Sequence, residues 1–454
     1  MKTLEIKNSK INTSNISTIA PKDGTIVLDL INSEMYIRNL FIRDIENLTN
    51  YAVLSSNNSK LYVESSEGDY RASPQWTKSF SSSMNYGNGM SCNITATEIP
   101  DVIFIACGYK HSIAIKEDGT LWGTGSNNHN QLGLDHDISK VSSFTQIGYD
   151  TDWKFVACGY EHSIAIKEDG TLWGAGTNES GRLGLGGLIT ETETFTRIGD
   201  DNDWKYVSCG HSHSVTIKED NSVWGTGSDW YGQLGFEWGG DVRVVFVPLN
   251  IVPSIICKCG DNHTFTLSED KKVYGTGSNT SGQIGLGHNN PVENFTEVTD
   301  VGTCNYIECG SQYTMIIKED GTLWGTGSNG SGQLGIDNTT DEIENFTSVV
   351  VSSGSNDNWK SVSCGGHHTI STKEDNSVYG TGSSSYGQLG FGNNSYDTFH
   401  EGSENNKDIL VSCGDDHSFL LLHDKSVWST GRNIDGQLGQ GNYLDVSYFT
   451  EISD

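Results

Sequence analysis

The 454-residue sequence predicts an all-β fold, a seven-bladed β-propeller of four-stranded antiparallel blades that follows a small β-rich N-terminal module. Three observations predict it. A segment that begins Cys107-Gly-Tyr-Lys-His returns six more times, at intervals of 49 to 55 residues. Each copy contains four short stretches rich in β-branched and aromatic residues, with turn-forming residues between them. Seven copies at this period indicate a closed ring of similar blades.

The first copy illustrates how each blade is expected to form. Its four predicted strands are residues 101–106, 112–116, 121–125 and 144–147. The turn between the second and third strands needs a residue that tolerates a positive φ, and Gly119 provides it. Asn221 and Asn376 stand at the same position in other copies, and asparagine is the non-glycine residue that best tolerates this conformation. The large aromatic residue of the third strand, Trp122 here, is expected to fill the space between adjacent blades.

The chain before the repeats divides into two predicted parts. Residues 1–65 contain several apolar stretches separated by turn signals, which predict a small β-rich N-terminal docking module. A domain of this size has a marginal core, so we expect it to dock onto a partner or onto the propeller. Residues 66–100 are rich in serine, glycine and asparagine and are expected to form a linker. Residues 101–454 are the predicted propeller.

The overall charge limits which kinds of molecule the protein is expected to bind. With 28 basic and 58 acidic residues, the formal net charge is −30. This charge repels nucleic-acid phosphates and anionic lipids, so we expect no nucleic-acid partner and no membrane insertion. It favours soluble protein partners with basic surfaces. No apolar run is long enough for a signal peptide or a membrane span, which leads us to expect a virion or cytoplasmic location.

The repeated cysteines and histidines are expected to be structural. Seven of the ten cysteines open the repeats, and a histidine follows four residues later in six copies. Equivalent atoms on different blades lie too far apart for the ligand distances of zinc, so we expect no metal and no cofactor. We expect each histidine to make a hydrogen bond to a turn of its own blade. No hydrolase, phosphate-loop or metalloprotease motif is present, so the sequence predicts no catalytic residues and no enzyme.

Positions that differ between the copies are the better candidates for function. They are the two residues after each Cys-Gly and two residues in the longer loop between the third and fourth strands. Aromatic side chains there are typical interface anchors, although packing within the blades would also explain them. The candidate partner-binding residues are Tyr109, Tyr160, His211, Trp230, Tyr231, Trp238 and Tyr386.

Two motifs support a family resemblance over residues 101–454. Cys-Gly-x-x-His-Ser-Ile-Ala-Ile and Asp-Gly-Thr-Leu-Trp-Gly-Thr-Gly resemble repeats of the regulator of chromosome condensation family, most of all its bacterial and bacteriophage members. The resemblance implies a seven-bladed propeller but not one function, because members of the family do unrelated work.

We therefore expect a non-enzymatic, protein-binding or structural propeller. Its expected place is an appendage or tail of a phage virion, or a similar assembly, to which the N-terminal module anchors it. One alternative is a guanine-nucleotide exchange factor, although the repeats hold no insertion long enough for a protruding wedge. Another alternative is an enzyme-inhibitor propeller, against which the lack of a signal peptide counts.

The ends of the repeat region predict how the ring closes. Residues 101–106 are the predicted first strand of the first copy, and Phe449–Ile452 are the predicted fourth strand of the last copy. In every other copy a fourth strand leads directly into the first strand of the next copy, so only these two strands lack such a connection. An open ring would expose unpaired strand edges. We therefore expect the C-terminus to lie beside the start of the repeats, with Phe449 packed between the first and last blades.

Overall fold

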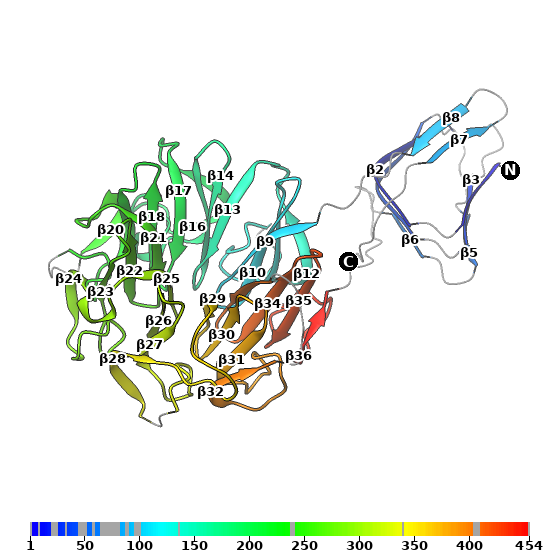
Figure 1. The fold of residues 1–454 in the computed structure, drawn as a ribbon. Helices are drawn as coiled ribbons and strands as arrows, with labels where there is room; N and C mark the ends of the chain where they lie inside the picture. The colour runs from blue at the N-terminus through cyan, green and yellow to red at the C-terminus, as the bar shows by residue number, and fades with distance from the viewer. Residues whose placement is uncertain are drawn as a thin grey trace. The chain divides into compact units, whose positions relative to one another are not determined.

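The computed structural model describes residues 101–452, apart from 135–136, 237–240, 338–339 and 403–408, together with the backbone of the strands before residue 100. The chain divides into two compact units, residues 1–100 and residues 101–452. The second unit consists of seven four-stranded antiparallel sheets arranged as blades around a centre (Figure 1). This arrangement confirms the predicted fold class. Among the described residues no helix is long and apolar enough to cross a lipid bilayer.

The strands of the first four blades follow one another in chain order. Blade 1 contains β9 (Val102–Cys107), β10 (His111–Lys116), β11 (Leu121–Ser126) and β12 (Lys140–Ile147). Blade 2 contains β13 (Trp153–Cys158), β14 (His162–Lys167), β15 (Leu172–Thr177) and β16 (Glu191–Ile198), with the 3-10 turn η1 (Glu179–Gly181). Blade 3 contains β17 (Trp204–Cys209), β18 (His213–Lys218), β19 (Val223–Ser228) and β20 (Val242–Pro248). Blade 4 contains β21 (Ser254–Cys259), β22 (His263–Ser268), β23 (Val273–Gly277) and β24 (Val292–Glu297).

The last three blades have the same order. Blade 5 contains β25 (Cys304–Cys309), β26 (Tyr313–Lys318), β27 (Leu323–Ser328) and β28 (Glu342–Ser348), and the 3-10 turn η2 (Thr299–Val301) precedes it. Blade 6 contains β29 (Trp359–Cys364), β30 (His368–Lys373), β31 (Val378–Gly382) and β32 (Tyr396–Glu401). Blade 7 contains β33 (Ile409–Cys413), β34 (His417–Leu422), β35 (Val427–Gly431) and β36 (Val446–Glu451).

The core lies in the wedges between neighbouring blades. Between blades 2 and 3, for example, Ile164 and Leu172 pack with Trp204 and Val207, and the partly buried Trp224 covers them. The third-strand aromatic residues therefore lie between blades, as predicted. The turn glycine also behaves as expected: Gly119 has a φ of +74° and Asn221 one of +64°.

A belt of buried histidines joins each blade to the next. His111 Nε2 lies 2.8 Å from Ser163 Oγ in the following blade, and Ser163 Oγ donates its only proton to the Gln131 carbonyl at 2.7 Å. The imidazole must therefore carry its proton on Nε2 and donate it to the serine. The same contact joins His162 to Ser214, His213 to Thr264, His263 to Thr314, His368 to Ser418 and His417 to Ser112.

This belt corrects one prediction about the histidines. Their side chains bind the next blade and not a turn of their own blade. In the fifth copy Tyr313 replaces the histidine, and its longer side chain donates to the His368 carbonyl. The sequence could not distinguish the two arrangements, because spacing along one blade says nothing about which neighbour the ring reaches.

The position of Phe449 corrects a second prediction. Each outer-strand phenylalanine packs back onto the preceding blade, so Phe449 of blade 7 lies among Ile370, Val378 and Leu389 of blade 6. A Cβ added at Gly390 would lie 2.2 Å from its ring, so only glycine leaves room there. At the seam, which is the junction between blade 7 and blade 1, the equivalent residue is Phe144. Its ring lies 6.0 Å from that of Phe419. Ile452 and Val102 do pack against the same hydrophobic cluster, which joins blade 7 to blade 1.

The N-terminal unit contains two sets of parallel strands. β1 (Lys2–Lys7), β3 (Ile26–Ile31) and β5 (Ala52–Ser56) form one sheet, and β2 (Lys10–Ile19), β4 (Glu34–Arg43) and β6 (Lys60–Val63) form the other. Lys2 pairs with Ile26 and Glu34 with Lys60, so successive partners are 24 to 26 residues apart. β7 (Ser82–Tyr86) and β8 (Met90–Ile94) form an antiparallel hairpin inside the predicted linker. The division into module and linker stays a prediction.

Candidate partner-binding face

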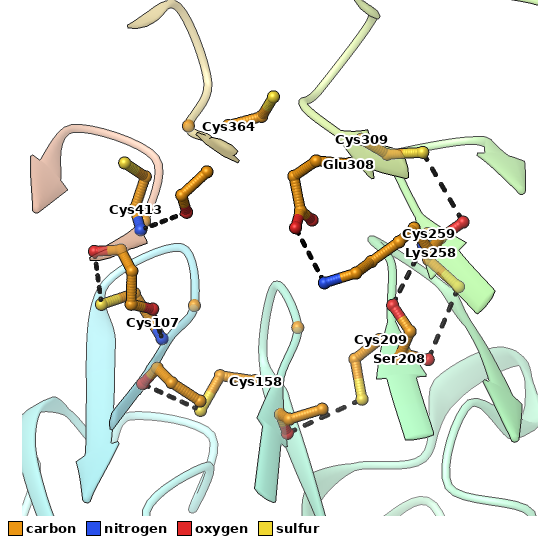
Figure 2. Close-up of a pocket in the computed structure, with 18 of the residues that line it drawn as sticks. Cys107, Cys158, Ser208, Cys209, Lys258, Cys259, Glu308, Cys309, Cys364 and Cys413 are labelled. Atoms are coloured by element: carbon orange, nitrogen blue, oxygen red, sulfur yellow. Dashed lines mark hydrogen bonds and ion pairs between the residues drawn. The ribbon is translucent and has the colours of Figure 1, made fainter. Parts of the chain in front are cut away.

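The innermost strands of all seven blades surround a cavity of about 540 Å³. Each of these strands ends in the Cys-Gly pair, so the next residue of each copy lies at the mouth of this channel. Figure 2 shows the seven repeat cysteines placed around the opening. The nine cysteines that the structure describes are free thiols, and burial raises the pKa of Cys413 to about 11 and that of Cys107 to about 12. These thiols are therefore protonated at neutral pH and are poor nucleophiles.

Three predicted site residues stack on one another at the mouth. The ring centroids of Tyr109 and Tyr160 lie 4.1 Å apart, and those of Tyr160 and His211 lie 4.0 Å apart. The three rings therefore form one continuous stack across blades 1 to 3. Burial, the Tyr160 hydroxyl and the Asp415 carboxylate raise the pKa of Tyr109 to about 12. The role of these residues in binding stays a prediction.

Two carboxyl groups lie on other blades of the same mouth. Burial raises the pKa of Asp261 to about 6, and a hydrogen bond with Ser311 partly offsets the shift. Burial, followed by repulsion from Asp416 and Asp261, raises the pKa of Asp415 to about 7. Among the described residues neither Asp261 nor Asp415 forms an ion pair, whereas Asp416 pairs with Arg432 at 3.2 Å.

The second set of variable loops lies on the same face as the first. His129 of blade 1 contacts Glu161 of blade 2 at 3.2 Å, and Gln388 of blade 6 donates to Asp416 of blade 7 at 3.4 Å. We call these two sets of loops together the variable-loop face. They are residues 109–110, 160–161, 211–212, 261–262, 311–312, 366–367 and 415–416, and residues 128–129, 179–180, 230–231, 280–281, 330–331, 385–386 and 434–435.

The remaining candidates lie on the rim of this face. Trp230 is 65% exposed and Tyr231 is 47% exposed, so both are open to a partner. Tyr386 is partly covered, because the Arg432 guanidinium lies 4.8 Å from its ring centroid. Trp238 lies outside the described residues.

Deeper in the channel, the structure contains an ion pair that was not predicted. Lys258 Nζ lies 2.8 Å from Glu308 Oε2, and the two side chains point toward each other (Figure 2). Burial lowers the pKa of Lys258, but the Glu308 carboxylate together with Tyr206 and Tyr306 outweighs this effect, and the net shift is upward. Tyr306 donates to Glu308 at 3.0 Å. The equivalent positions in the other blades are small residues, namely Ala106, Ala157, Ser208, Ser363 and Ser412. Two opposite charges at positions that are otherwise small could have indicated this ion pair from the sequence.

The fold and the face together define a class of protein: a repeat propeller in which near-identical blades carry different loops on one face. The sequence pattern of the RCC1-like domain matches residues 190–453. The pattern of the regulator of chromosome condensation (RCC1) repeat matches residues 102–131 and 153–182, and a second form of it matches 118–166. The chain therefore belongs to the regulator of chromosome condensation family.

Similar proteins share the repeats over part of their length. The chain is 35% identical over 147 residues to the ultraviolet-B receptor UVR8 of Arabidopsis thaliana, which is 32% of this chain and 32% of that protein. It is 33% identical over 156 residues to the X-linked retinitis pigmentosa GTPase regulator homolog of Caenorhabditis elegans, 33% of this chain and 11% of that protein. The chain thus spans about a third or less of these two relatives.

Solved structures agree on the fold. The structure of human WBSCR16 covers 74% of this chain and 94% of its own, with a TM-score of 0.66 at 21% identity. Prp20p from Saccharomyces cerevisiae covers 69% of this chain and 80% of its own, with a TM-score of 0.61 at 21% identity.

Proposed function

We propose that this chain is a non-enzymatic protein-binding propeller that engages its partner through the variable-loop face. One observation carries the proposal: the loops of this face differ from copy to copy while the blades beneath them are nearly identical. The face combines exposed aromatic side chains, such as Trp230 and Tyr231, with carboxylates that lack an ion-pair partner among the described residues. Exposed aromatic anchors beside polar groups are typical of protein interfaces.

The relatives support a shared scaffold and not a shared partner. The names of the two relatives described above are those of a light receptor and of a GTPase regulator. Guanine-nucleotide exchange therefore stays the alternative, and a nucleotide-release assay with a small GTPase tests it directly. An enzyme-inhibitor role is the other alternative.

We further propose that the N-terminal module, residues 1–65, anchors the propeller in a larger assembly, of which a phage virion or tail is our specific suggestion. The division of the chain at residue 100 supports a separate anchoring unit. Mass spectrometry of purified particles tests the suggestion, because a virion component must be present at a fixed copy number. A chain that lacks residues 1–100 should fold but no longer join the particle.

A matched pair of surface variants tests the binding face. The double variant Trp230→Ala, Tyr231→Ala removes the rim aromatics, and Tyr149→Ala removes an aromatic side chain that is 85% exposed in the connection from β12 to β13. Successive connections alternate between the two ends of antiparallel strands, so this control lies on the opposite face. Cross-linking to the captured partner should weaken at least tenfold in the double variant and remain unchanged in the control. Equal binding by the unchanged chain, the double variant and the Tyr149→Ala control would contradict the proposal that this face binds the partner.

A further inference from the structure

We propose that the mouth of the channel is a socket for one cationic side chain of the partner, a lysine ammonium or an arginine guanidinium held between Asp261 and Asp415. This inference rests on the proposed function, since it assumes that the variable-loop face binds a protein. It adds the chemistry of the group that enters the channel.

The two carboxylates face the same cavity from different blades. Asp261 lies on blade 4 and Asp415 on blade 7, both line the channel, and they repel each other electrostatically. A cation between them would remove this repulsion and compensate for the burial of both groups. Among the described residues no cluster of three metal-ligating side chains is found, and two carboxylates alone are too few for the oxygen ligands that calcium requires. An organic cation is the better fit.

The two equivalent residues between them in the ring, Ser311 and Gly366, are small and leave room for the socket. Gly366 stands at the equivalent position of blade 6, and a Cβ added there would lie 2.2 Å from Asp415 Oδ1. Any other residue would displace the carboxylate. Ser311 on blade 5 is also small, so the side of the mouth between the two aspartates stays open while blades 1 to 3 are filled by the stacked rings.

Two cations of the chain, Lys110 and Arg432, already lie near the socket. Lys110 Nζ lies 5.0 Å from the centroid of the Tyr109 ring, and its charge lowers the pKa of Asp415 to a small extent. Lys110 therefore competes with an incoming cation. Arg432 pairs with Asp416, and its charge also lowers the pKa of Asp415, more than Lys110 does. Arg182 lies 3.9 Å from Glu161.

Binding should be linked to protons. Because the pKa of Asp261 is raised to about 6 and that of Asp415 to about 7, both are partly protonated near neutral pH. A bound cation stabilises their charged forms, so binding at pH 7 releases protons and strengthens between pH 5 and pH 8. The other titratable groups around the mouth are Tyr109, Lys110, Tyr160, Glu161, Arg182, His211, His367, Asp416 and Arg432. Burial and the nearby Arg182 lower the pKa of His211, so this imidazole is protonated less readily than a free one.

The experiment titrates the full chain with four acetylated and amidated pentapeptides of glycine that carry a central lysine, arginine, norleucine or citrulline. Isothermal calorimetry in two buffers of different ionisation enthalpy measures affinity and protons released together. We expect the lysine or the arginine peptide to bind at least tenfold more tightly than its neutral counterpart, with net proton release at pH 7.

Four variants make the test specific. Asp261→Asn and Asp415→Asn should each weaken binding of the cationic peptide at least tenfold. Asp300→Asn changes an exposed aspartate in the connection before blade 5 and should alter binding less than twofold. Lys110→Ala should strengthen binding severalfold, because it removes a competing cation. This gain is an effect that a loss of folding cannot imitate.

The outcomes separate the two proposals. If neither cationic peptide binds at millimolar concentration, or if Lys110→Ala weakens binding, the socket is wrong. The protein-binding role would still stand if the partner cross-links to the rim and the double variant Trp230→Ala, Tyr231→Ala abolishes this cross-linking. If the peptides bind but no partner contacts this face, the socket stands and the proposed function falls.

Discussion

His417 Nε2 and Ser112 Oγ lie 2.9 Å apart and join the last blade of the propeller to the first. Ser112 Oγ also donates to the Gln437 carbonyl at 3.1 Å, so the histidine is the donor, as it is between blades 1 and 2. Blade 7 contains β33 to β36 and blade 1 contains β9 to β12, so each terminal blade is built from consecutive strands. A backbone bridge between Ser143 and Gln440 also joins the two blades, so the ring is closed by contacts of the same kinds that join its other blades.

The variant Ser112→Ala should destabilise the propeller about as much as Ser163→Ala. Each removes the acceptor of a buried imidazole N–H, which costs about 1–3 kcal/mol. Both hydroxyls are completely buried. The free energy of unfolding from urea titrations measures the two effects. A much smaller cost for Ser112→Ala would mean that the seam does not behave as an ordinary joint between blades.

Stability should fall steeply as the solution becomes acidic. Burial lowers the pKa of His111, His213, His263, His368 and His417 to about 3, and that of His162 falls well below its usual value. The unfolded chain takes up these protons near pH 6.5, so the stabilisation is complete above that pH and is lost below it, by about 1.4 kcal/mol per histidine per pH unit. Asp229, Asp261 and Asp415, with raised pKa values, act in the opposite direction, but they are fewer than the six histidines.

Melting temperatures measured from pH 8 to pH 4 check this expectation. His162→Gln provides the control, because it should cost about 1–3 kcal/mol at pH 7.5 yet reduce the slope of stability against pH. A melting temperature that stays constant from pH 7.5 to pH 4.5 would show that the buried imidazoles do not control acid stability.

Phe449→Ala should cost about 3–5 kcal/mol, because its ring fills the wedge between blades 6 and 7. Tyr448→Ala on the same strand is the control, since that side chain is 64% exposed and its removal should change stability by less than about 0.5 kcal/mol. Urea titrations compare the two. Similar costs for both variants would place Phe449 outside the core.

The channel ion pair should respond unequally to single and double replacement. Lys258→Ser or Glu308→Ser leaves a buried charge without its partner, which costs about 3–5 kcal/mol. The double variant should cost less than either single variant, because serine already stands at the equivalent positions Ser208 and Ser363. A double-mutant cycle from denaturant unfolding measures the coupling. Strictly additive costs would mean that the two charges do not depend on each other.

The period and turn chemistry of the repeats were enough to predict the blades and their order. Contacts between blades were harder to predict, because the sequence of one blade does not show which neighbouring blade a side chain contacts. This is why Phe449 was placed at the seam, where Phe144 lies, and why the histidines were assigned to their own blades. The parallel pairing near the N-terminus was also missed, although Asn-Ser recurs at residues 8–9, 32–33 and 58–59.

The candidate site was predicted in part. Variation between copies was enough to indicate Tyr109, Tyr160 and His211, which the fold brings into one stack. The same variable positions include Asp261 and Asp415, but sequence alone could not reveal that both carboxylates are largely buried and form no ion pair within the described part of the chain. Such a property depends on where charges from distant blades meet.

The uniform joints around the ring have a consequence for chain connectivity. Because no strand is exchanged between the first and last blades, the seam can in principle lie between any two blades. A circularly permuted chain that begins at the first strand of another blade would keep all seven sheets and the whole histidine belt. The order of the blades around the ring, rather than the position of the chain ends, is what determines the arrangement of loops that a partner meets.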